Sequence, residues 1–166
     1  MSVTTMTGSP LPTTLAVREL LEGMFGRDVD GKTGSGAVNP AAAPGAMVGV
    51  YTDDKLATRA IVIADLPLAA YGGAALALIP VRQAEEAIEA GLLPEALSEN
   101  FGEVLNVAAS WFNVEGAPHV KLYGTFQPGE VLPPDIQKWV LAFVRRLDLE
   151  LAVAGYGSGR LSILAL

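Results

Sequence analysis

The sequence predicts an α+β (mixed α/β) domain in which a largely antiparallel sheet packs against helices. Two observations carry this prediction: helical and strand-like segments are intermixed along the 166 residues, and two pairs of strand-like segments are separated only by short polar turns. Strands joined in this way pair as antiparallel hairpins, and a sheet with one apolar face needs helices to cover it. The length suits a single domain over 1–166.

The first hairpin is expected to join strands 46–51 and 56–64 through Thr52-Asp53-Asp54-Lys55. The second joins 147–154 and 160–166 around Tyr156-Gly-Ser-Gly, and residues 119–127 alternate as a further strand. The apolar run 161–166 suits either a core strand or a sheet edge that continues into a second subunit.

Helices are expected where apolar residues recur at helical spacing. The first, 15–25, begins at a Thr14 cap and ends at Gly26, and the second, from about 67 to 78, begins at an Asp65 cap. The others are expected at 82–90, at 94–113, and from 133 or 134 through Arg146. Two segments are expected to be flexible: the N-terminal residues 1–13 and the Gly/Ala/Pro-rich tract 31–45.

Charge and hydropathy exclude several functional classes. A net charge of −7 with no basic run of five or more residues argues against nucleic-acid binding. The mean hydropathy of +0.38 is high, but Asp65 and Pro67 interrupt the most apolar stretch, so no membrane span is expected. Cysteine is absent, which removes disulfides and thiolate metal sites, and the N-terminus lacks the pattern of a signal peptide. We therefore expect a cytoplasmic protein.

Two other features are weak candidates for a site. Gly26 and Gly31-Lys32-Thr33 have the spacing of a phosphate-binding loop, but they follow a helix and run into Gly-Ser-Gly, which cannot open one. His119 is the only histidine, so a histidine-based metal site or triad would depend on it alone. We predict no bound nucleotide, no metal and no cofactor of the protein's own.

The helix expected at 94–113 carries the strongest candidate. Placing successive residues 100° apart gathers its apolar side chains on one side and a narrow polar stripe on the other. The stripe contains Glu99, Glu103, Asn106, Ser110 and Asn113. A solvated face is the ordinary explanation. However, like charges at i and i+4 destabilise a helix, and asparagine is a poor mid-helix residue, so stability alone does not explain the stripe.

The segment Glu99-Asn-Phe-Gly-Glu103-Val-Leu-Asn106 resembles the Glu-x-x-Asn helix of the CheC/CheX/FliY group of chemotaxis phosphatases, in the CheX-like form with one active motif. Glu99 stands where that group usually has Asp or Ser, and Pro128 stands near the proline that follows the motif. The earlier copy, Glu19-Leu-Leu-Glu22, has Glu in the Asn position, which implies an inactive half.

The resemblance implies the CheC/CheX fold and a phosphatase acting on the aspartyl phosphate of a CheY-like response regulator. Asn106 would orient the attacking water, Glu103 would pair with the regulator's lysine, and Glu99 and Ser110 would contact the partner. Mg²⁺ would come from the regulator, and a homodimer is expected. Two alternatives remain open: a non-enzymatic partner-binding module of the same fold, and a small-molecule sensor with the 31–45 tract as its lid.

Overall fold

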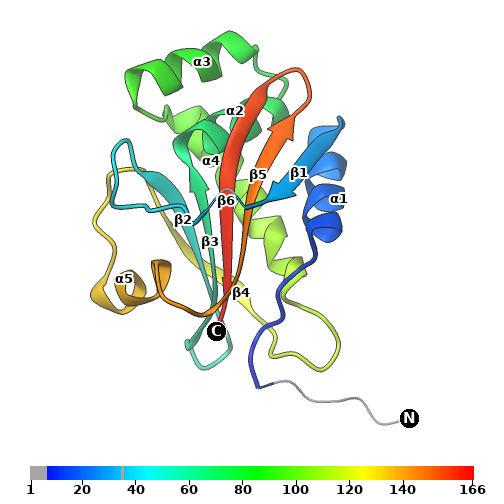
Figure 1. The fold of residues 1–166 in the computed structure, drawn as a ribbon, viewed down its shortest axis with the longest axis vertical. Helices are drawn as coiled ribbons and strands as arrows, with labels where there is room; N and C mark the ends of the chain where they lie inside the picture. The colour runs from blue at the N-terminus through cyan, green and yellow to red at the C-terminus, as the bar shows by residue number, and fades with distance from the viewer. Residues whose placement is uncertain (1–6, 35) are drawn as a thin grey trace.

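A six-stranded antiparallel sheet forms the centre of the computed structural model, which describes residues 7–34 and 36–166. Its strands lie in the order β1-β5-β6-β3-β2-β4, and every neighbouring pair is antiparallel (Figure 1). The bounds are β1 Val29–Thr33, β2 Ala46–Thr52, β3 Thr58–Asp65, β4 Lys121–Phe126, β5 Arg145–Val153 and β6 Gly157–Ala165. The predicted α+β class with an antiparallel sheet is confirmed.

The helices are α1 Thr14–Phe25, α2 Leu66–Leu76, α3 Val81–Ala90, α4 Glu95–Val107 and α5 Pro134–Val140, with a 3₁₀ helix, η1, at Ala108–Trp111. Asp65 caps α2 as predicted, because its carboxylate accepts the Leu68 N–H at 2.9 Å. Gly26 ends α1 in the left-handed conformation, but the cap at the start of α1 is Thr13 and not Thr14. Among the described residues, no helix is long and apolar enough to cross a membrane.

The two faces of the sheet carry separate cores because neighbouring side chains of a strand point to opposite sides. On β3, Ala60, Val62 and Ala64 face a core that α1, α2 and α4 supply, whereas Ile61 and Ile63 face a second core under α5 and the loop before β2. Helices α1 and α4 therefore lie on the same face of the sheet. This shared face positions the candidate site.

The C-terminal strand lies inside the sheet. β6 pairs with β5 on one side and with β3 on the other, so the run 161–166 is a core strand and not an edge open to a second subunit. Of the two arrangements that its apolar sequence allowed, the structure selects the buried one, in which both ladders satisfy the backbone groups of β6.

The helix expected from residue 133 or 134 through Arg146 is too long. α5 ends at Val140, and Arg145 and Arg146 already belong to β5. Phe143 lies at helical spacing from the buried Ile136 and Val140, yet it is fully exposed between the two elements. The reason is that Arg145 and Arg146 pair with Ala165 and Leu164 of β6, which requires extended backbone here.

The two segments expected to be flexible are partly held by contacts. Residues 31–33 of the 31–45 tract form part of β1, and Val38 is buried and donates its N–H to the Ser162 hydroxyl at 2.9 Å. In the N-terminal segment, buried Ser9 donates its N–H to the Leu166 carbonyl. Residues 1–6 and 35 lie outside the described residues. The mobility of both segments stays a prediction.

Candidate functional site

Helix α4 has one deeply buried side. Leu97, Phe101, Val104 and Leu105 are each no more than 2% exposed and pack against α2 and the sheet. These positions repeat at three- and four-residue intervals, which places them in one stripe and directs the remaining side chains outward. The buried stripe therefore decides which α4 residues a partner could reach.

A close approach to α2 fixes the position of α4. A Cβ atom added at Gly73 would lie 2.3 Å from the Leu97 carbonyl oxygen, and one added at Gly72 would lie 2.9 Å from the Phe101 ring. Only glycine allows the two helices to lie this close. Asn100 completes the contact by donating its side-chain amide to the Gly73 carbonyl at 3.0 Å. Glycine lowers the helix propensity of α2, but the Gly72-Gly73 pair is what allows α4 to pack closely against it.

Strand β2 holds the other end of α4. The buried Tyr51 hydroxyl donates a hydrogen bond to the Leu105 carbonyl, and its ring lies 5.2 Å from that of Phe112. A Cβ at Gly49, two residues earlier, would lie 3.4 Å from the Leu105 side chain. Burial raises the pKa of the Tyr51 hydroxyl, so it stays protonated and donates across the physiological pH range.

The outward face of α4 and η1 presents Glu99, Glu103, Asn106 and Ser110, all of them exposed. We call these four residues the polar face. Within the part of the chain that the structure describes, none of these four side chains makes a hydrogen bond or ion pair with another residue. Glu103 and Asn106 lie three residues apart, or about 4.5 Å along the helix axis, so both can contact one bound group.

Asn113, the fifth residue of the predicted stripe, does not belong to the polar face. The helix expected to run to Asn113 ends at Val107 and continues only as η1. The Asn113 amide donates to the Val120 carbonyl at 2.9 Å and accepts the Val120 N–H at 2.8 Å, which closes the loop before β4. Asparagine forms such local bonds more readily than it stays in a helix, so its role is structural.

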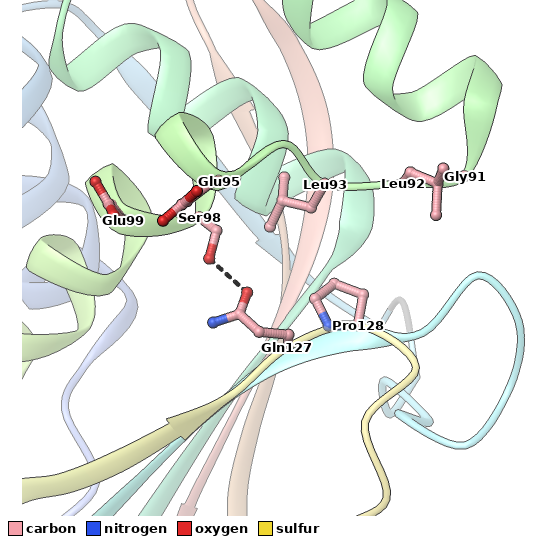
Figure 2. Close-up of a pocket in the computed structure, with 8 residues that line it drawn as sticks. All are labelled: Gly91, Leu92, Leu93, Glu95, Ser98, Glu99, Gln127 and Pro128. Atoms are coloured by element: carbon pink, nitrogen blue, oxygen red, sulfur yellow. Dashed lines mark hydrogen bonds between the residues drawn. The ribbon is translucent and has the colours of Figure 1, made fainter.

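A cavity of about 480 Å³ opens beside the first turn of α4 (Figure 2). Glu95, Ser98 and Glu99 line it from the helix, and Gln127 and Pro128 line it from the segment after β4. The Ser98 hydroxyl donates a hydrogen bond to the Gln127 side-chain oxygen, which links the two sides of the cavity. Pro128, noted in the sequence as the proline following the motif, therefore lies at the same end of α4 as Glu99.

The corresponding acidic residues on α1 are arranged differently. Glu22, which occupies the asparagine position of the first motif copy, accepts the Val29 N–H at 3.0 Å and so supports β1. Arg18 secures the same residue by donating to the Val29 carbonyl at 2.8 Å. Glu19 is exposed. α1 thus offers no free pair equivalent to Glu103 and Asn106.

The other candidates from the sequence lie elsewhere. Gly31, Lys32 and Thr33 form part of β1, and the described residues between β1 and β2 contain no helix, so the context of a phosphate-binding loop is missing. His119 is exposed just before β4. Among the described residues, no group of three or more histidine, aspartate or glutamate side chains is placed to hold a metal ion.

Comparison with solved structures identifies the fold. The FliM middle domain from Vibrio alginolyticus matches over 89% of this chain and 85% of its own, with a TM-score of 0.55 and 10% identity. FliM in the FliM-SpeE complex from H. pylori matches over 90% and 79%, with 0.56 and 8%. FliY from Thermotoga maritima matches over 89% and 81%, with 0.50 and 13%.

At these identities the likeness concerns the fold, and the predicted CheC/CheX-type fold is confirmed. No family model and no curated protein matches the sequence. The structure also adds residues that the sequence analysis did not single out: Tyr51, Gly73 and Asn100, which hold α4 in place. Only the glycine pair had a visible signal, as an unfavourable sequence within a helix.

Proposed function

We propose that this protein is a phosphatase that hydrolyses the aspartyl phosphate of a CheY-like response regulator. One observation carries the proposal: Glu103 and Asn106 are exposed and without internal partners, on a helix that is otherwise closely packed. An active residue that must enter another protein's cleft needs this combination of free polar atoms and rigid support.

The proposed chemistry asks little of the protein. In the proposed complex the phosphoryl group is already bonded to the regulator's aspartate, and the regulator would supply the Mg²⁺. No nucleophile is therefore needed from this chain, only a water molecule in line with the phosphorus. The Asn106 amide can both donate and accept, which suits it to orient that water. The Glu103 carboxylate would pair with a lysine beside the phosphoryl group and so dock the helix.

The test is the lifetime of a phosphorylated response regulator from the same genome, measured as phosphate release. We expect the wild-type protein to shorten that lifetime and Asn106→Ala and Glu103→Ala to lose the effect. Glu19→Ala is the matched control, because Glu19 is an exposed glutamate on α1, another helix on this face of the sheet. An unchanged lifetime with the wild-type protein across the genome's regulators would exclude the phosphatase.

A second candidate is a partner-binding module without hydrolysis. It is favoured by the FliM structures, whose TM-scores of 0.55 and 0.56 exceed the 0.50 of FliY, and by the FliM-SpeE complex, in which this fold binds another protein. The same experiment separates the two candidates. If this protein is such a module, both its wild-type form and its Asn106→Ala variant should bind the regulator. Neither should change the lifetime of the phosphorylated regulator.

A further inference from the structure

The hydrogen bond from Tyr51 to α4 acts on the backbone of Asn106 itself. The Leu105 carbonyl and the Asn106 N–H belong to one planar peptide unit, because the C–N bond between them has partial double-bond character. Tyr51 donates to that carbonyl at 2.5 Å. Fixing this plane restricts the backbone angle that precedes the Asn106 side chain, and side-chain rotamers depend on backbone angles.

The bond also lies where helical hydrogen bonding changes. α4 ends at Val107, and the N–H of Ala108 bonds to the carbonyls of Val104 and Asn106, on either side of Leu105. Carbonyls in the last turn of an α-helix lack regular helical partners and need other donors. The Tyr51 hydroxyl supplies such a donor to Leu105 from β2.

Packing holds the Tyr51 side chain in place. The residue is fully buried on β2, which lies between β3 and β4, and its ring packs against Phe112 just after η1; the strand register shifts beside Tyr51 in both pairings. The hydroxyl is therefore held by the sheet on one side and holds the end of α4 on the other. The hydrogen bond from this side chain therefore fixes one peptide unit of the helix relative to the sheet.

We propose that Tyr51 is a positioning residue for Asn106: its hydroxyl sets the orientation of the Leu105–Asn106 peptide and so the direction of the Asn106 amide. The inference deepens the proposed function, in which Asn106 orients water, and it rests on that function only for its effect on catalysis. Its effect on the Asn106 backbone holds for any partner of the polar face.

The test compares Tyr51→Phe with Tyr156→Phe. Tyr156 is a matched control, because its hydroxyl also donates to a backbone carbonyl, that of Ile79 at 2.8 Å, beyond the end of α2. Amide hydrogen exchange and ¹⁵N relaxation are measured across α4 in both full-length variants. In Tyr51→Phe we expect the amide exchange rate of Asn106 to rise roughly fivefold to tenfold more than the exchange rates of the sheet amides. A factor of this size corresponds to the net free energy of one hydrogen bond. Tyr156→Phe should leave Asn106 unchanged.

Equal exchange and equal order at Asn106 in the two variants would overturn the inference, whatever the activity. The phosphatase assay adds a second readout. In Tyr51→Phe we expect the rate at saturating regulator to fall about tenfold with KM unchanged, while Tyr156→Phe keeps the wild-type rate. A wild-type protein without activity would reject the proposed phosphatase, and the exchange measurement would still decide the role of Tyr51.

Discussion

Helices α1 and α4 cover the same face of the sheet and bury similar apolar stripes, yet they use their polar residues in opposite ways. On α1, Glu22 and Arg18 both hydrogen-bond to Val29, so these side chains serve the fold. On α4, Glu103 and Asn106 remain exposed and unpaired within the described residues. The difference separates a helix that completes the structure from one that the structure presents to a partner.

The largest effect is expected from Asn106→Ala. If the phosphatase proposal holds, this substitution removes the group that orients the water, and the rate of phosphate release should fall at least about 100-fold. The free energy of unfolding should change by less than about 0.7 kcal/mol, because the side chain is exposed and alanine favours helix. Urea unfolding and the release assay on one preparation measure both. A large loss of stability would show that Asn106 serves the fold, as Glu22 does.

Gly73→Ala tests the close packing of α4 against α2. The new Cβ would lie 2.3 Å from the Leu97 carbonyl oxygen, so α2 and α4 must separate. We expect the free energy of unfolding to fall by about 2–3 kcal/mol. Gly23→Ala is the control on α1, because a Cβ there meets nothing within 4 Å. It should raise stability by about 0.5–1 kcal/mol through helix propensity. Similar results for the two variants would contradict the close approach.

Glu22→Ala should produce the reverse of the Asn106 result. It leaves the Val29 N–H without its acceptor, and we expect a loss of about 1–2 kcal/mol in the free energy of unfolding. Phosphate release should keep its wild-type rate when measured well below the unfolding transition. A loss of activity without a loss of stability would place α1 in the functional surface and remove the contrast between the helices.

The smallest change in stability is expected from Glu103→Gln. Glu99 and Glu103 are like charges one turn apart, and such a pair destabilises a helix by about 0.2–0.5 kcal/mol. Neutralising one of them should raise the thermal midpoint slightly at low salt, and the gain should vanish at high salt because salt screens exposed charges. A midpoint lowered at low salt would mean that Glu103 has a stabilising partner.

The sequence predicted α4 well and its surroundings less well. Apolar residues at helical spacing defined the buried stripe and thereby the exposure of Glu103 and Asn106. The same reasoning extended α5 into β5, because the apolar positions of a short helix and of the strand that follows it can together resemble the pattern of one longer helix. β1 was missed because Gly31, in its middle, has no side chain to show alternation. Tyr51 could not be found, since a bond to a backbone carbonyl 54 residues away leaves no mark in the sequence.

The order of the strands also bears on how the protein folds. The strand and helix that hold α4 in place, β2 and α2, precede it with β3 and α3 as the other elements of that stretch, and β4 follows it, so these contacts form within one continuous part of the chain. Among the described strands, β1, against which α1 packs, pairs with β5 alone, with Val29 opposite Val153. Closing so long a loop is entropically costly and slow. During synthesis the polar face therefore has its supports early, whereas α1 and β1 must wait for the C-terminal hairpin to emerge.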